Sequence, residues 1–158
     1  MKRFLMVCVA LLLAVTVMNA QSEQVVLHVI ETSDVHGCFL PYDFINAKDK
    51  PGSLARVQTY VKQLRKDNPG RVVLLDNGDI LQGQPICYYY NYLKPNDENV
   101  AASVINYMGY DAETIGNHDV ETGHKVYDKW IKEVHCPMLG ANVINTQTGK
   151  PYLKPYTL

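Results

Sequence analysis

Apolar residues along this chain form two kinds of segment. Four short apolar runs have the length of buried strands, at 25–30, 71–75, 112–115 and 138–143. Four longer segments between them carry apolar residues at helical spacing, at 52–67, 84–93, 97–108 and 124–134. The first run is nearly unbroken, which predicts a strand buried on both faces. Strands that alternate with helices predict an α/β fold, with a parallel or mixed sheet and helices on its faces.

Several helix ends are marked by residues that cap or stop a helix. The Asn-Pro-Gly string at 68–70 is expected to end the first helix, and Asp97 is expected to cap the third. Gly109 follows the last apolar residue of that third helix and is a typical C-terminal stop. The polar string at 145–149 predicts a turn after the fourth strand.

The first residues resemble a secretory signal rather than part of a fold. Two basic residues precede fifteen uncharged residues, 4–18, and Ala20 supplies a small residue at a cleavage position. We therefore predict a signal peptide at 1–20, a mature chain at 21–158, and a periplasmic or extracellular location. An uncleaved N-terminal anchor is the alternative, whereas the cleaved chain would have no stable membrane span.

Charge and cysteine content narrow the classes of partner. Removing residues 1–20 leaves 13 basic against 16 acidic side chains, so the chain has no electrostatic footprint for a nucleic-acid polymer or an anionic membrane. Three cysteines remain, without the Cys-x-x-Cys spacing of a zinc site. They can form one disulfide whose pairing the sequence does not define.

Three short motifs fall at the carboxyl ends of predicted strands. They are Asp-Val-His-Gly at 34–37, Gly-Asp at 78–79 and Gly-Asn-His-Asp at 116–119. Each places a carboxylate, imidazole or amide beside a glycine that permits a tight turn. In open α/β sheets, ligands bind outside the carboxyl ends of the strands, and right-handed crossovers can bring the three motifs together there.

These side chains suit two divalent cations that share one carboxylate. Asp79 is the candidate bridging ligand, Asp34 and His36 are expected to bind the first metal, and Asn117 offers its amide oxygen to the second. Mixed oxygen and nitrogen ligands favour zinc, manganese or iron. Two cations about 3.5–4 Å apart would offset the negative charge of a phosphate ester and activate water at neutral pH.

The histidine and the acid that follow Asn117 are candidates for catalysis. His118 is expected to face the substrate as an acid, so that Asn117 and His118 would both contact it. Glu121, three residues later, can accept a hydrogen bond from the other ring nitrogen and fix the tautomer. The alternatives for these residues are structural: Asx-turns for Asp34 and Asp79, a helix cap for Asn117, and a solvated Glu121.

In this order the three motifs resemble those of the calcineurin-like metallophosphoesterases. Segments 30–37 and 76–83 are similar to the exported 5′-nucleotidase and 2′,3′-cyclic-nucleotide 2′-phosphodiesterase branch of that family. The resemblance implies a four-layer α-β-β-α metallophosphoesterase fold, present here as its N-terminal portion, 21–158. It also implies hydrolysis of nucleotide phosphate esters by hydroxide activated at a dinuclear metal site. The matching metal ligands are Asp34, His36, Asp79 and Asn117, and His118 matches the catalytic histidine.

The chain departs from the family pattern in three ways. Glu121 stands where the family usually has aspartate, no Gly-His-x-His motif follows, and the domain that selects the nucleotide is absent from the sequence. We therefore expect the isolated chain to hold its metals loosely and to show little activity. The alternatives are an inactive truncated fragment, a non-catalytic exported binding module on the same scaffold, or a related enzyme for another small-molecule ester.

Other residues that attract attention have structural interpretations. His28 lies in a predicted strand and is interpreted as a core residue, while His124 is a candidate to support the site from the next helix. The clustered tyrosines 88, 89, 90 and 92 suggest either a base-stacking platform or, as we prefer, packing of a helix with hydroxyls that reach water.

Overall fold

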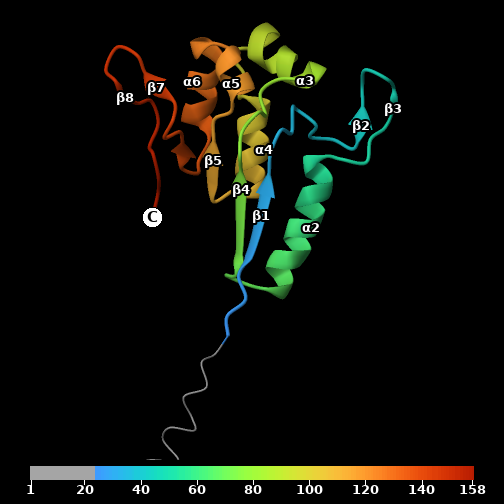
Figure 1. Ribbon diagram of the computed structural model, residues 1–158. Helices are drawn as coiled ribbons and strands as arrows, with labels where there is room; N and C mark the ends of the chain where they lie inside the picture. The colour runs from blue at the N-terminus through green and yellow to red at the C-terminus, as the bar shows by residue number, and fades with distance from the viewer. Residues whose placement is uncertain (1–23) are drawn as a thin grey trace, which may run out of the picture.

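The computed structural model describes residues 24–158, so the predicted signal peptide lies outside the described residues. A parallel four-stranded sheet in the order β1-β4-β5-β6 forms the centre of the molecule (Figure 1). Its strands are β1 (His28–Thr32), β4 (Val72–Asp76), β5 (Ala112–Thr114) and β6 (Met138–Leu139). None of the helices formed by residues 24–158 is long and apolar enough to cross a membrane.

Helices connect these strands, and two small hairpins extend from them. The helices are α2 (Leu54–Asp67), α3 (Pro85–Tyr88), the π-helix η1 (Tyr89–Leu93), α4 (Val100–Met108), α5 (Asn117–Glu121) and α6 (His124–Glu133). The hairpins pair β2 (Tyr42–Asp43) with β3 (Lys48–Asp49), and β7 (Ile144–Asn145) with β8 (Lys150–Pro151). The predicted turn at 145–149 joins β7 to β8 and is confirmed. The hairpin at 42–49 and the short helix α5 were not predicted.

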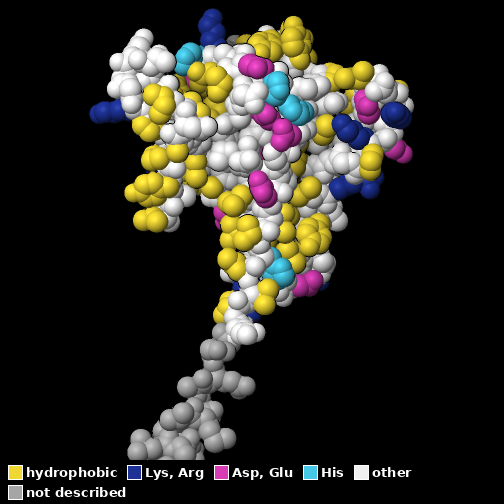
Figure 2. Space-filling view, in the orientation of Figure 1, with side chains coloured by type: hydrophobic (Ala, Val, Ile, Leu, Met, Phe, Trp, Pro, Cys, Tyr) yellow, Lys and Arg dark blue, Asp and Glu magenta, His cyan; other side chains and the backbone are white. Residues whose placement is uncertain are grey.

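One face of the sheet carries the helices, and the other is open. Each strand follows its neighbour across the sheet in chain order, so crossovers of one hand place all the connecting helices on the same face. Leu74 points to that face and is fully buried, whereas Val29 on the opposite face is 58% exposed. Figure 2 shows hydrophobic side chains uncovered over the strands. Within residues 24–158 the helices therefore cover one face of the sheet, as in the α-β-β-α arrangement that the family resemblance implies.

The first strand is also less buried than its sequence predicted. β1 begins at His28, and its residues alternate between half-buried and exposed. Residues 25–27 precede the strand, and Val25, Val26 and Leu27 are all more than half exposed. A strand at the edge of the sheet with one uncovered face cannot bury both sets of side chains, whatever their hydrophobicity.

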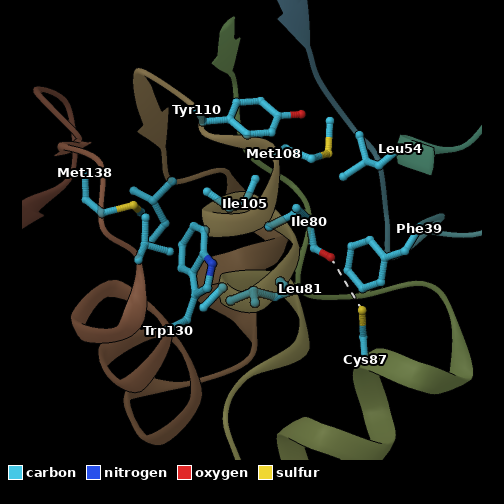
Figure 3. Close-up of a cluster of buried hydrophobic side chains, with 14 of the residues drawn as sticks. Phe39, Leu54, Ile80, Leu81, Cys87, Ile105, Met108, Tyr110, Trp130 and Met138 are labelled. Carbon is cyan, nitrogen blue, oxygen red and sulfur yellow. Dashed lines mark hydrogen bonds between the residues drawn. The ribbon is translucent and has the colours of Figure 1, made fainter. Parts of the chain in front are cut away.

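The core lies between the sheet and the helices. Trp130 from α6, Ile105 and Met108 from α4, and Val61 from α2 are at most 2% exposed and belong with Leu74 to one cluster of buried side chains. Figure 3 shows Trp130, Ile105 and Met108 within this cluster. Burial of such side chains contributes roughly 1.5–3 kcal/mol each. This single cluster holds α2, α4 and α6 against the strands, and so fixes the edge of the sheet where the candidate site lies.

Helix boundaries follow local capping, with one correction. Ser53 caps α2, and Gly109 ends α4 with a left-handed φ of 65°. The N-cap of α4 is Asn99 and not Asp97: its side-chain oxygen accepts hydrogen bonds from the backbone N–H groups of Ala101 and Ala102. The predicted fourth strand is also shorter, since only Met138 and Leu139 pair with β5. The cysteines at 38, 87 and 136 carry free thiols.

Candidate metal centre

Three loops meet at the carboxyl end of the sheet. The Asp34 N–H donates to the carbonyl of Gly78 over 3.1 Å, and the His36 N–H donates to the carbonyl of Asp79 over 2.9 Å. The N–H of His118 donates to Oδ1 of Asp79 over 2.8 Å. Figure 2 shows acidic and histidine side chains gathered on the surface at this end. The three motifs therefore lie side by side, although up to 45 positions of sequence separate one from the next.

Three of the predicted site residues form a compact group of potential metal ligands. One ligand atom each from His36, Asp79 and His118 lies within 4.8 Å of the other two. The rings of His36 and His118 are edge to face, with centroids 5.2 Å apart. Asp79 is buried and the histidines are half-buried, so a carboxylate and two imidazoles share one partly sheltered position. This donor set fits zinc, manganese or iron.

Asp34 lies outside this group of histidine and acidic side chains, and Asn117 would be an amide ligand at the start of α5. Asp34 is exposed, and its carboxylate accepts a hydrogen bond from the hydroxyl of Ser33. Asn117 is the first residue of α5 and is also exposed. The structure thus brings the three motifs together, while the three-residue group contains His118, which the sequence analysis had placed toward the substrate.

The candidate ligands adopt a backbone conformation that is unusual for their residue types. Among residues 24–158, the non-glycine residues with positive φ are Asp34, His36, Ala47 and Asp79. The φ values of the three ligand candidates are 53°, 50° and 62°. Left-handed backbone costs free energy in residues with a Cβ, and such residues are concentrated at functional sites. The hydrogen bonds between the loops hold this conformation in place.

Two glycines let the loops approach each other. Gly78 has a φ of 89°, and a Cβ there would lie 2.4 Å from the backbone nitrogen of Gly116. A Cβ on Gly116 would lie 2.2 Å from Oδ1 of Asp79. Both distances are far below a van der Waals contact, so glycine is required at both positions for Asp79 to lie beside α5.

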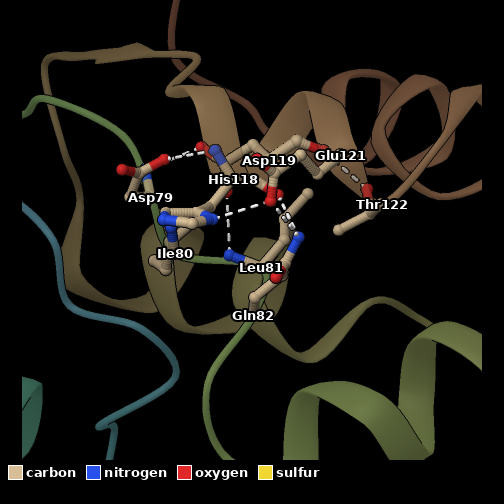
Figure 4. A network of polar contacts seen from close by, with 8 residues as sticks. All are labelled: Asp79, Ile80, Leu81, Gln82, His118, Asp119, Glu121 and Thr122. Atoms are coloured by element: carbon tan, nitrogen blue, oxygen red, sulfur yellow. Dashed lines mark hydrogen bonds and ion pairs between the residues drawn. The ribbon is translucent and has the colours of Figure 1, made fainter.

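Asp119 organises the loop that carries Asp79, a role that the sequence analysis missed. Its Oδ2 accepts hydrogen bonds from the N–H groups of Asp79 and Gly116, at 2.7 and 2.9 Å. Figure 4 shows Asp119 beside Asp79, Ile80 and Leu81. Its Oδ1 accepts from the N–H groups of Ile80 and Leu81, both at 2.9 Å. An acid at the third position of a helix that reaches back to its N-cap is a capping pattern, and this was the available signal.

The charge of Asp119 is held in a fully buried position. Burial raises the pKa of Asp119, and the four backbone N–H hydrogen bonds act in the opposite direction. All four partners are donors, so the carboxyl group only accepts hydrogen bonds, as the ionised form does. A neutral acid would have to place a proton against one of these donors.

His118 and Glu121 form a pair on α5. Nδ1 of His118 lies 2.8 Å from Oε2 of Glu121. This hydrogen bond raises the pKa of His118, and the charges of Glu121 and Asp79 act in the same direction. The same bond lowers the pKa of Glu121. The Gln82 amide donates to the carbonyl of His118 over 2.6 Å and so connects the β4 loop to the pair (Figure 4).

Two acidic residues, Asp76 and Glu113, lie beneath the site. Asp76 accepts hydrogen bonds from the Thr32 hydroxyl and from the Gly78 N–H, the latter over 2.9 Å. Glu113 on β5 is fully buried, and neither of its carboxyl oxygens has a hydrogen-bond partner among residues 24–158. Burial, and then the nearby charge of Asp76, raise the pKa of Glu113 well above its ordinary value. The raised pKa favours the neutral form of Glu113, which would add no charge to the core.

The remaining residues noted in the sequence lie outside the group of ligands. His28 is half-buried at the start of β1, and His124 is exposed at the start of α6, with Nδ1 2.6 Å from the Tyr127 hydroxyl. The tyrosines lie on α3 and η1, as the predicted helix required. Tyr88, Tyr89 and Tyr92 are 59%, 43% and 47% exposed, so these side chains are partly open to water.

Comparisons with known proteins agree with this geometry. The family model described as calcineurin-like phosphoesterase matches residues 27–153. A 2′,3′-cyclic-nucleotide 2′-phosphodiesterase/3′-nucleotidase from Yersinia enterocolitica is 34% identical over 154 residues, and a 5′-nucleotidase from Bos taurus is 34% identical over 123. The crystal structure of the calcineurin-like phosphoesterase YfkN from Bacillus subtilis superimposes with a TM-score of 0.74 at 31% identity.

The chain is much shorter than these relatives. The alignment with the Yersinia protein covers 94% of this chain and 23% of that protein, and the alignment with the bovine protein covers 74% and 20%. The superposition on YfkN covers 83% of this chain and 41% of the crystallised chain. The match falls on the N-terminal part of the larger relatives.

Proposed function

This chain belongs to the calcineurin-like phosphoesterase family, and from that premise we propose that its site takes part in metal-dependent hydrolysis of nucleotide phosphate esters. The observation that carries the proposal is that two assigned metal ligands, His36 and Asp79, and the assigned acid, His118, each bring one ligand-type atom within 4.8 Å of the other two. The relatives named as nucleotidases and cyclic-nucleotide phosphodiesterases support the substrate class.

We assign the metal ligands as the sequence predicted them. Asp79 would contact both of two divalent cations, Asp34 and His36 would complete the first, and Asn117 would reach the second. Bound cations would supply positive charge for the phosphoryl oxygens and an activated water. The protein's own contribution is to hold the Asp79 carboxylate rigid, through the Asp119 contacts and through the N–H of His118.

His118 is assigned the role of proton donor to the leaving oxygen. Its Nδ1 is occupied by Glu121, which leaves Nε2 as the nitrogen that can meet a substrate. Because Glu121 raises the pKa of His118, the imidazole stays protonated to higher pH and can act as a general acid. Asn117, the residue before it, would contact the same phosphoryl group.

The proposal is tested by metal binding. Mn²⁺ titration followed by electron paramagnetic resonance should show binding to the chain, and Asp79→Asn should weaken it more than tenfold. Asp97→Asn is the matched control, because Asp97 is an exposed acid outside the site. Unchanged Mn²⁺ binding in Asp79→Asn would overturn the assignment. Nucleotide binding that ignores the metal would instead favour a non-catalytic binding module.

Export remains part of the proposal. The support is the sequence of residues 1–20, with its basic start, uncharged run and small residue at position 20. N-terminal sequencing of the chain recovered from its host should begin at Gln21. A chain that retains Met1 in the cytoplasmic fraction would contradict it.

A further inference from the structure

A pocket lies between α2 and α4, on the helix layer and apart from the metal centre. Its volume is about 360 Å³, within the range of pockets that bind small molecules. One wall includes Leu54, Gln58 and Lys62 from α2, and the other includes Tyr107 and Met108 from α4. Among residues 24–158, none of the candidate metal ligands lines the pocket, and no acidic side chain does. The pocket is therefore separate from the metal centre and has a chemistry of its own.

The floor of the pocket belongs to the hydrophobic core. Phe39, Leu54 and Met108 line it and are 5%, 2% and 2% exposed. Figure 3 shows these three side chains at one side of the buried cluster. Because packing in the core holds them in place, the floor is formed without a ligand. Such a floor favours the apolar part of a ligand, whose surface it removes from water.

Gln58 is the buried polar side chain of this pocket. It is 8% exposed, and its Oε1 has no hydrogen-bond partner among residues 24–158. A buried amide oxygen without a partner costs free energy, and a ligand that hydrogen-bonds the amide recovers part of that cost. The terminal torsion of glutamine is broad, so the amide can turn toward a ligand. A hydroxyl group suits this position, because it both donates and accepts and can pair with either end of the amide.

Lys62 adds a positive charge at the rim of the pocket. It follows Gln58 by four positions on α2, so the two side chains lie on the same face of the helix, about 6 Å apart along its axis. Nζ of Lys62 donates to the Tyr107 hydroxyl over 2.8 Å and lies 4.9 Å from the centroid of that ring. Lys62 is exposed and forms no ion pair within residues 24–158. The other N–H groups of its ammonium therefore remain for an anion.

We propose that this α2–α4 pocket, formed by Phe39, Leu54, Gln58, Lys62 and Met108, binds a small phenolic carboxylate. The ring lies on the apolar floor, the hydroxyl bonds to the Gln58 amide, and the carboxylate pairs with Lys62. One helical turn separates Gln58 from Lys62, a spacing that a single ring with a short acid side chain spans. A ligand without a hydroxyl would leave the buried amide unpaired, and a ligand without a carboxylate would leave the rim charge without a partner. The site does not depend on the proposed function, since the metal centre contributes no residue to it.

NMR titration of the full chain with three related probes tests the proposal. The first is para-hydroxyphenylpropionate, which carries both polar groups. Phenylpropionate lacks the hydroxyl, and para-propylphenol lacks the carboxylate. We expect para-hydroxyphenylpropionate to bind about fivefold more tightly than either of the others, because only it makes both polar contacts. Its binding should shift the amide signals of α2 and α4.

Two variants assign the polar contacts to their residues. Gln58→Leu should give para-hydroxyphenylpropionate and phenylpropionate the same affinity. Lys62→Met should weaken the binding of both carboxylates and leave that of para-propylphenol unchanged. Lys66→Met is the control, since Lys66 is a basic residue of α2 that does not line the pocket. Asp79→Asn should also leave the binding of all three probes unchanged, which separates this site from the metal centre.

Several outcomes would overturn the proposal. They are absence of binding, equal affinity for the three probes, and shifts confined to residues outside α2 and α4. Tighter binding of decanoate than of para-hydroxyphenylpropionate would show a site for aliphatic acids and would overturn the phenolic ligand. If Gln58→Leu does not fold, the comparison of probes in the wild type and in Lys62→Met decides the result. A Lys62→Met variant that binds the carboxylates as the wild type does would remove the assigned anion contact.

Discussion

Asp119 and Asp79 are joined across 40 positions of sequence by one short hydrogen bond, from the Asp79 N–H to Oδ2 of Asp119 over 2.7 Å. The bond connects a fully buried acid on α5 with the candidate bridging ligand at the end of β4. Because Asp119 also accepts from Gly116, Ile80 and Leu81, it fixes the β4 loop and the start of α5 as one unit.

Replacing Asp119 should damage stability and the site together. Asp119→Asn exchanges one acceptor oxygen for an NH2 group, which would oppose backbone N–H donors and leave them unpaired. We expect a loss on the order of 3 kcal/mol in the free energy of unfolding, measured with urea. Weaker Mn²⁺ binding should accompany it. Asp97→Asn should change neither quantity, and a fully stable Asp119→Asn variant would contradict the anchoring role.

Gly78 should not tolerate a side chain. In Gly78→Ala the new Cβ would meet the backbone of Gly116, and the positive φ adds further strain. We expect a destabilisation of about 2 kcal/mol or more, together with loss of Mn²⁺ binding. Gly52→Ala is the matched control, because nothing lies within 4 Å of a Cβ at that position. Equal melting temperatures for the two variants would show that the loops can separate at little cost.

The His118–Glu121 pair predicts a defined pH response. Glu121 raises the pKa of His118, so the stabilising effect of the pair is present below the unfolded pKa and is lost as pH rises through the folded pKa. Glu121→Gln should lower the pKa of His118, followed by NMR of the ring protons in the metal-free chain. Glu98→Gln, an exposed control, should leave it unchanged. An identical His118 titration in both variants would rule out the pairing.

Glu113 should make the protein less stable at higher pH. Burial raises the pKa of Glu113, so its folded form binds a proton that the unfolded chain releases. Stability is therefore full below the ordinary glutamate pKa and declines as pH rises through the folded value. Glu113→Gln resembles the protonated acid in shape and should reduce the decline in urea stability between pH 5 and pH 8. The urea stability of the Glu98→Gln control should decline with pH as that of the wild type does. If the stability of Glu113→Gln declines by the same amount, Glu113 is ionised in the folded protein.

Local patterns account for much of the fold. The apolar runs at 71–75 and 112–115 predict β4 and β5 to within one residue at each end, because their length and composition suit no other element. Gly109 predicts the end of α4 for a purely local reason, since it alone adopts the left-handed conformation cheaply. Asp97 was a poorer guide, because Asn99, two residues later, also has a side chain that can cap, and it is Asn99 that caps α4.

The sequence by itself determined the alternation of strands and helices and the three glycine-flanked motifs at the ends of strands, because helix spacing, strand length and turn chemistry are properties of neighbouring residues. Only the tertiary structure decided that one face of the sheet stays open among residues 24–158, that His118 joins His36 and Asp79, and that Asp119 anchors the backbone of Asp79. Those features depend on contacts between residues about 40 or more positions apart. Such contacts follow from the packing of helices on a twisted sheet, which no local pattern records.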